Sequence, residues 1–138
     1  MVSSDAGDDE NNRPPEHLFD HGRRLESAGK MDAAIEMFLS GLAVEPDNLS
    51  AHTELRTIAL KRKAAGGKSL GMIEVIRLKR RRQSGLQNLI NAEKLMAFDP
   101  GNTDQMVDFR AAAARCGLRE ISSWVESILR KATDRSSG

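Results

Sequence analysis

The 138-residue chain has one cysteine, no tyrosine and one tryptophan. A lone cysteine, Cys116, cannot form an internal disulfide or provide a thiolate cage for a metal. Aromatic residues make up only 4% of the chain, which is few for a protein that stacks nucleobases on aromatic rings. No apolar run approaches the roughly 20 residues that span a bilayer. Because the first ten residues are acidic, unlike the basic start of a signal peptide, we expect a cytoplasmic protein.

Helix-forming residues dominate what remains. Ala, Leu, Met, Arg, Lys and Glu are frequent, and long β-branched runs are absent. The hydrophobic share of 39% and charged share of 30% are ordinary for a globular protein. We therefore expect an all-α fold with one domain over residues 14–136. Residues 1–13, which lack periodic apolar positions, are predicted to be a disordered acidic tail.

The net charge of +1 conceals a strong asymmetry. Residues 1–58 carry 12 acidic and 5 basic side chains, a balance of −7. Residues 59–82 carry nine basic side chains against one glutamate, a balance of +8, whereas residues 83–138 are balanced. The basic block is therefore local and needs an explanation of its own.

Two helices separated by a glycine turn are predicted between Pro15 and Asn48. Apolar or small residues at 18, 22 and 25 share one helical face, and Gly29 follows as a helix stop. A second apolar stripe includes Ala34, Ile35 and Phe38. It ends before Pro46, after which Asp47 or Asn48 can cap the next helix.

This stretch resembles the tetratricopeptide repeat, a 34-residue helix-turn-helix unit. With Pro15 as the first position, Ala34 and Phe38 match the family's A-x3-F signature and Pro46 ends the unit. Gly22 occupies the family's small-residue position, while His21 and Gly41 depart from the usual leucine and alanine. The resemblance implies a right-handed superhelix of stacked helix pairs.

The same period predicts two more units. Pro46 and Pro100 lie 54 residues apart, which is one repeat of 34 plus 20. The second unit is therefore predicted over 49–102, with a 20-residue insertion at about 63–83 between its two helices. A third unit is predicted over 103–136, in which Gly117 occupies the repeat position that Gly29 has in the first. Three helix pairs result, the second interrupted.

The resemblance implies a non-enzymatic scaffold that binds a partner protein or peptide in a concave groove lined by the first helix of each unit. The implied positions include several acids, which would repel a partner's carboxylate and favour a basic or apolar segment. The alternative is that these acids are ordinary solvated charges. The groove positions are Phe19, Asp20, Arg23, Thr53, Glu54, Thr57, Asp104, Val107, Asp108 and Ala111.

The insertion is a second candidate contact surface. Its middle can form a short amphipathic helix with Met72, Ile73 and Ile76 on one face. Alternatively, it is a loop packed over the helices. The basic block also leaves nucleic-acid binding open, and self-association through the apolar residues is a third interpretation. The insertion residues concerned are Lys68, Met72, Ile73, Ile76, Lys79, Arg80, Arg81 and Arg82.

Known chemical motifs are incomplete in this chain. Gly67, Lys68 and Ser69 suggest a phosphate-binding loop, but Arg62 stands where the motif needs its first glycine. His17 and His21 share a helix face without the glutamate of a zinc-protease motif or a third ligand. We predict no catalytic residues, no metal site and no cofactor.

Overall fold

The computed structural model describes residues 14–80 and 84–137. Within these ranges the chain is all-α, with seven helices and no strands, which confirms the all-α part of the prediction. The predicted tail over residues 1–13, and Arg81 and Arg82 of the insertion, lie outside the described residues. The helices are α2 (Pro15–Ser27), α3 (Met31–Val44), α4 (Leu49–Ala64), α5 (Met72–Leu78), α6 (Gly85–Ala97), α7 (Thr103–Arg115) and α8 (Arg119–Ser137).

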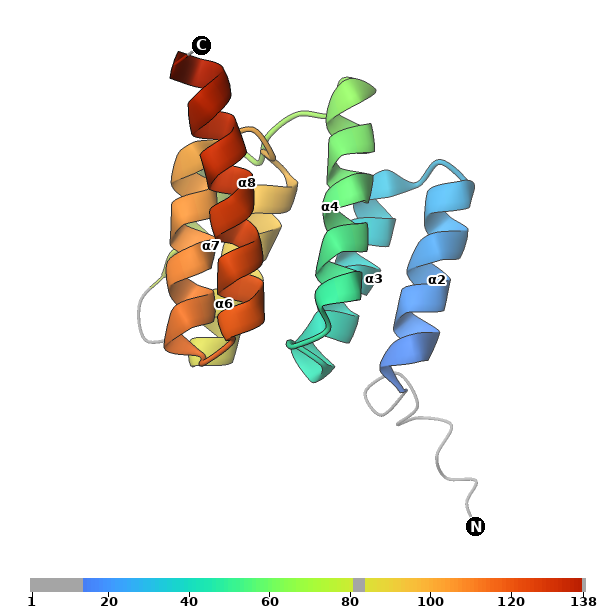
Figure 1. The fold of residues 1–138 in the computed structure, drawn as a ribbon. Helices are drawn as coiled ribbons and strands as arrows, with labels where there is room; N and C mark the ends of the chain where they lie inside the picture. Colours follow the sequence, from blue (N-terminus) through green and yellow to red (C-terminus); the bar gives the residue numbers. More distant parts are fainter. Residues whose placement is uncertain (1–13, 81–83, 138) are drawn as a thin grey trace.

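The helices form two groups that lie side by side, α2, α3 and α4 in one and α6, α7 and α8 in the other (Figure 1). Each group has its own hydrophobic core. The first core is built by α2, α3 and α4, with Ala97 and Phe98 added from the end of α6. The second is built by α6, α7 and α8, with Leu49 packed against it from α4.

The α2–α3 pair is held by two aromatic rings that each lie against a glycine. The rings of Phe19 and Phe38 are 5.3 Å apart between centroids. A Cβ atom on Gly22 would lie 2.7 Å from Phe38 Cδ1, and one on Gly41 would collide with Phe19. Both glycines therefore create the space that lets the two helices approach so closely. The departure from alanine at 41 is explained by the ring of Phe19.

The predicted helix boundaries have clear local causes. Gly29 and Gly117 both adopt a positive φ, 81° and 75°, after α2 and α7. In each turn the next residue donates its backbone N–H five residues back, Lys30 to Leu25 and Leu118 to Ala113, both at 2.9 Å. Asn48 caps α4 by accepting a hydrogen bond from the N–H of Ala51 at 2.9 Å. Asn102 and Ser84 cap α7 and α6 in the same manner.

The second predicted pair differs from the first. Helix α6 packs chiefly against α7 and α3, and less extensively against α4. Helix α8 also lies beside α4, on the face of the molecule turned toward the viewer in Figure 1. The segment between α4 and α6 contains the helix α5, which packs against α6. With this segment in place of a short turn, α6 is not constrained to lie against α4.

No helix in the two described stretches combines the length and the apolar character that crossing a membrane requires.

Candidate interaction surfaces

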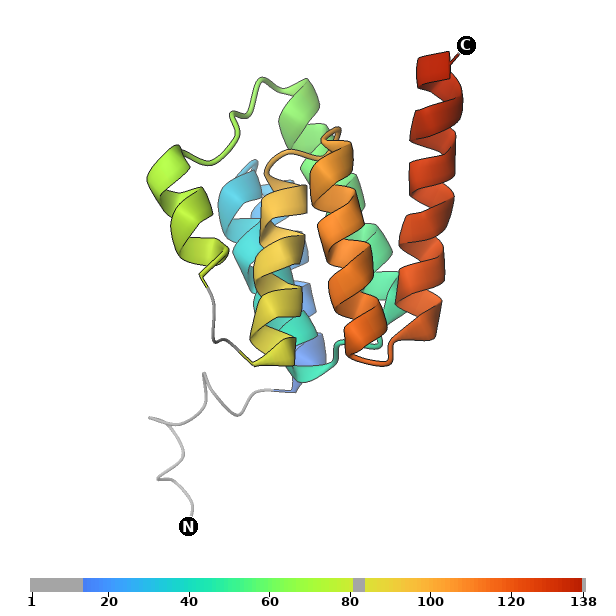
Figure 2. The same cartoon turned by 90° about the vertical axis from the view of Figure 1, so that its left-hand side faces the viewer.

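Helix α5 turns three large apolar side chains toward solvent. Met72, Ile73 and Ile76 are 78%, 74% and 65% exposed. Their spacing of one and four places them on one side of the helix. Glu74, Val75 and Leu78 are half-buried on the other side. In Figure 2, α5 stands at one edge of the molecule, beside α6.

Polar contacts to the helical body fix the orientation of α5. Asn91 of α6 donates a hydrogen bond to the carbonyl of Leu78 at 3.2 Å. Glu74 lies 3.7 Å from the ammonium of Lys94, and Lys79 lies 3.8 Å from Asp108 of α7. Because both ends of α5 are held, the apolar side chains face outward as a defined surface.

Arg62 anchors the loop that leads from α4 to α5. Its guanidinium lies 4.4 Å from the centroid of Phe98 and pairs with Asp32 at 2.6 Å. It also donates to the carbonyl of Lys68 at 2.8 Å. Gly67 allows the backbone to lie against the same side chain, since a Cβ there would be 2.6 Å from Arg62 Cγ. Arg62 therefore has a structural role. From the sequence alone it was only one member of the basic block.

The basic block divides between paired and unpaired side chains. Lys61 pairs with Glu26 at 2.7 Å, and Arg77 with Glu74 at 3.0 Å. Lys68 and Arg80 are exposed and make no ion pair with a described residue. Part of the positive charge is thus neutralised by acids from the N-terminal half, and the remainder lies around α5.

Three of the predicted groove residues meet in one ion-pair network. Arg23 donates to Asp20 Oδ1 at 2.7 Å and to both oxygens of Glu54 at 2.6 and 2.9 Å. The hydrogen bond to Glu54, together with the charges of both acids, raises the pKa of Arg23 above its ordinary value. Thr53 and Thr57 are exposed on the same helix as Glu54 and donate to backbone carbonyls one turn back. This network links α2 to α4.

Phe19 lies in the core and not on the groove surface. It is 4% exposed and packs between Phe38 and Gly41. The repeat position assigned to it would have faced a partner. Gly41 of α3 instead admits the ring between α2 and α3, so the side chain of Phe19 is not available at the surface.

The groove residues predicted on α7 take no part in the ion-pair network of α2 and α4. Asp104 and Val107 are exposed and Ala111 is half-buried. Asp108 faces Lys79 and lines a cavity of about 160 Å³ together with Leu78, on the α5 side of α7. The neighbour of α4 on its outer face is α8. Of the predicted groove positions, Phe19 is therefore buried and Asp108 faces Lys79.

A buried ion pair, missed by sequence reasoning, joins the two helix groups. His52 of α4 is 0% exposed and Glu93 of α6 is 1% exposed. His52 Nδ1 lies 2.7 Å from Glu93 Oε2, and Nε2 lies 2.8 Å from the carbonyl oxygen of Pro46. The ring also lies near Phe109 and Trp124, at centroid distances of 5.8 and 6.2 Å. The available signal was that Glu93 follows Leu89 by four residues and precedes Met96 by three, on the apolar stripe of α6.

Both ring nitrogens of His52 face oxygen atoms that accept hydrogen bonds. Burial of the ring lowers the pKa of His52. The negative charge and hydrogen bond of Glu93, aided by the Pro46 carbonyl, outweigh that effect and raise the pKa above its ordinary value. The imidazolium form can donate from both nitrogens, to Glu93 and to Pro46. When His52 is protonated, it therefore forms a charged hydrogen bond with Glu93 in a site closed to water.

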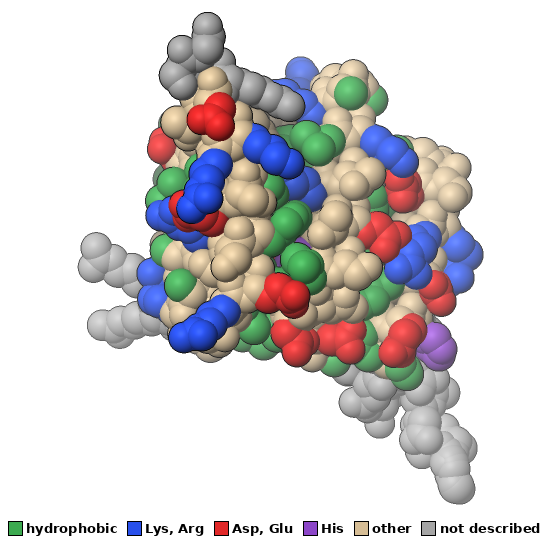
Figure 3. All heavy atoms as spheres, in the orientation of Figure 1, with side chains coloured by type: hydrophobic (Ala, Val, Ile, Leu, Met, Phe, Trp, Pro, Cys, Tyr) green, Lys and Arg blue, Asp and Glu red, His purple; other side chains and the backbone are tan. Residues whose placement is uncertain are grey.

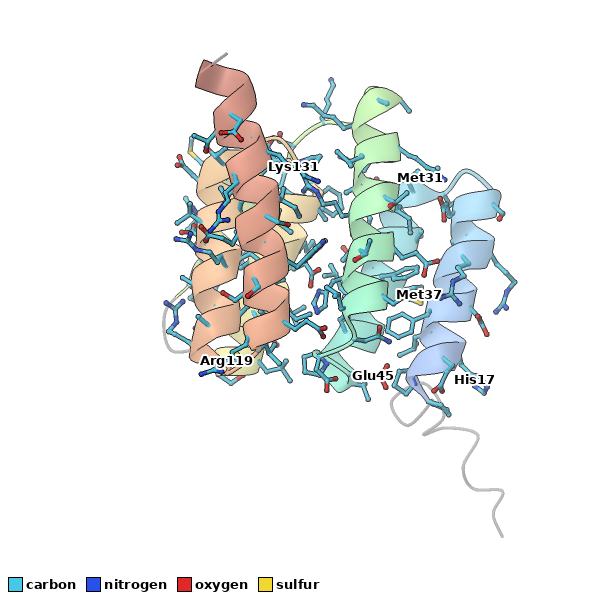
Figure 4. All side chains as sticks on the ribbon, viewed as in Figure 1. His17, Met31, Met37, Glu45, Arg119 and Lys131 are labelled. Atoms are coloured by element: carbon cyan, nitrogen blue, oxygen red, sulfur yellow. The ribbon has the colours of Figure 1, made fainter. Side chains whose placement is uncertain are left out.

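A furrow separates α4 from α8. Its volume is about 300 Å³, and it is lined by Arg56, Leu60, Met106, Ile128, Lys131 and Ala132. Hydrophobic side chains lie along the hollow between the two helices in the space-filling view (Figure 3). Figure 4 shows Lys131 on α8 beside this hollow. No sequence pattern pointed to it, because α4 and α8 are distant in the chain.

The described side chains include no cluster of three or more histidine, cysteine, aspartate or glutamate residues that could hold a metal ion. His17 is exposed and His21 is half-buried on α2.

No protein-family model, curated protein or solved structure was found to match this chain.

Proposed function

We propose that this protein is a non-enzymatic interaction scaffold that binds a partner protein through the outward face of α5. The supporting observation is the exposure of Met72, Ile73 and Ile76, each above 60%, on a helix whose opposite side is packed. Scattered apolar residues are normal on protein surfaces, but three on one face of a seven-residue helix form a contiguous patch. Such patches typically mark interaction sites.

The charges around the patch indicate the chemistry of the partner. Lys68 and Arg80 are exposed without an ion-pair partner among the described residues, and Arg77 and Lys79 are largely exposed. A partner with an apolar centre and an acidic rim would complement this surface. A second copy of the chain would bring the same cations together, so self-association is less favoured.

Nucleic-acid binding is the other alternative. Against it, Lys61, Arg62 and Lys79 lie within 4 Å of carboxylates, and the sequence of residues 59–82 contains no aromatic residue. A phosphate backbone would need cations free of such partners. A protein partner would contact the apolar residues of α5 as well as its charged residues.

The architecture that we propose for the scaffold is a right-handed superhelix of three tetratricopeptide-like pairs. Two features support it, the tight α2–α3 pair and the recurrence of its glycine turn between α7 and α8. The supporting hydrogen bonds are the same in both turns. In this arrangement α5 is an addition to the second pair, and the stacked helices hold it in place.

The test is affinity capture from a nuclease-treated lysate of the source cells, analysed by quantitative mass spectrometry. Wild type is compared with an Ile73→Glu/Ile76→Glu variant and with Val44→Glu, which alters an exposed valine of α3. We expect a protein partner that wild type and Val44→Glu retain and that the α5 variant loses. Equal capture by all three, or material recovered only without nuclease, would contradict the proposal.

A further inference from the structure

The furrow between α4 and α8 combines an apolar wall with two cations. Leu60 of α4 and Ile128 of α8 provide apolar sides, and the buried Met106 lies between them. Arg56 and Lys131 provide positive charge from the two facing helices. The furrow lies on the face of α4 and α8, whereas α5 stands at the opposite edge of the molecule (Figure 2). It is therefore a separate surface.

Arg56 differs from three other arginines of the helical body in lacking a carboxylate partner within residues 14–80 and 84–137. Arg23, Arg62 and Arg110 each have a carboxylate oxygen within 2.7 Å. Arg56 donates only to the backbone carbonyl of Pro100, at 3.2 Å, and has no carboxylate partner among the described residues. Burial without a counter-charge lowers the pKa of Arg56. A half-buried guanidinium in this state gains from an added carboxylate.

An acid that lines the same cavity as Arg56 makes no ion pair with it. Glu93 and Arg56 line the same small apolar cavity of about 10 Å³. Yet Glu93 Oε2 bonds to His52, and no ion pair forms between Glu93 and Arg56. Across the furrow, Lys131 is exposed and makes no ion pair with a described residue. Neither cation of the furrow therefore has a carboxylate partner in the part of the chain that the structure describes.

We propose that this furrow binds a peptide segment of a partner protein in which an acidic side chain lies between aliphatic residues. The carboxylate would pair with Arg56 and Lys131, and the aliphatic residues would cover Leu60 and Ile128. The volume of about 300 Å³ accommodates a few side chains and not a large ligand. The open shape of the furrow suits an extended or helical segment better than a small free acid, which would stay largely wet (Figure 3).

The experiment is selection from a random 12-residue peptide library displayed on phage. The full chain is the bait, and Leu60→Glu, which reverses the character of the furrow wall, is used for counter-selection. We expect enriched peptides that contain one acid flanked by aliphatic residues. An absence of enrichment, or enrichment of peptides without acids, would overturn the proposal.

A matched pair of synthetic peptides then tests the carboxylate. The best enriched peptide and its Glu→Gln or Asp→Asn form are titrated by fluorescence anisotropy. We expect the amide form to bind about tenfold more weakly, because one charge-assisted hydrogen bond is lost. Lys131→Glu should weaken binding of the acidic peptide by at least as much, whereas Lys63→Glu, an exposed charge reversal of α4 outside the furrow, should not. Equal affinities for the two peptides would overturn the proposal.

The outcome is independent of the α5 proposal. The Ile73→Glu/Ile76→Glu variant should bind the selected peptide as wild type does, because it leaves the furrow intact. If the peptide depends on Ile73 and Ile76 but not on Leu60, the furrow proposal is wrong while the α5 surface gains support.

Discussion

Two buried junctions hold this protein together by different means. Between α2 and α3, Phe19 and Phe38 pack against each other and each lies against a glycine. Between the two helix groups, His52 and Glu93 form an ion pair that is shielded from water and bonded to the Pro46 carbonyl. The first junction depends on shape, and the second depends on protonation and on both partners being present.

The largest effect is expected at the apolar junction. Phe38 is fully buried, so Phe38→Ala removes a ring from two contacts and leaves a cavity. We expect it to lower the free energy of unfolding by about 4 kcal/mol, measured by urea denaturation. A loss below about 1 kcal/mol would mean that the two helices collapse to fill the space.

Removing one member of the ion pair should cost almost as much. Glu93→Ala leaves His52 Nδ1 buried without a partner, and we expect a loss of about 3 kcal/mol in the same assay. Glu120→Ala, an exposed acid in the first turn of α8, should cost less than about 1 kcal/mol.

The double variant His52→Leu/Glu93→Leu sharpens the comparison. With both side chains replaced, no buried charge is left unpaired and only the Pro46 carbonyl loses its partner, so the double variant should cost less than Glu93→Ala alone. If the losses of the single variants simply add, the pair is not coupled in the way described.

The two junctions should also differ in pH dependence. The folded-state pKa of His52 is raised, so its contribution is fully present below the unfolded value of about 6.5 and is lost as pH rises through the folded value. Between pH 6 and 9, the difference in unfolding free energy between wild type and His52→Gln should therefore shrink. The difference between wild type and Phe38→Ala should stay constant. A gap for His52→Gln that widens with pH would contradict this assignment.

The smallest effect is expected at the exposed network of α2 and α4. Arg23 bridges Asp20 and Glu54, but its side chain is 48% exposed. Surface ion pairs are weak, so Arg23→Ala should cost less than about 1 kcal/mol in urea denaturation at physiological salt. A loss above about 2 kcal/mol would contradict this expectation and show that the network contributes substantially to the stability of the fold.

Local signals in the sequence predicted the helices well. Proline at 15 and 46, glycine at 29 and 117, and asparagine at 48 mark boundaries that depend only on neighbouring residues. The short α5 and its three-residue apolar face could also be predicted from the sequence, since helical spacing alone places Met72, Ile73 and Ile76 together.

Features that depend on contacts between distant helices could not be predicted from the sequence. The burial of Phe19 depends on Gly41 across the α2–α3 contact, and the furrow depends on how α8 lies beside α4. The His52–Glu93 pair joins residues 41 positions apart. Because the segment between α4 and α6 is long, the repeat period alone could not determine which helices α6 would contact.

The measurement that most directly tests the central claim is the affinity of the captured partner for wild type and for Ile73→Ala. Titration of the purified partner should show binding at least tenfold weaker for Ile73→Ala, because a hot-spot side chain at the centre of an interface contributes about 2 kcal/mol or more. Val44→Ala, at the exposed end of α3, should bind as wild type does. Unchanged affinity for Ile73→Ala would show that the outward face of α5 is not the contact surface.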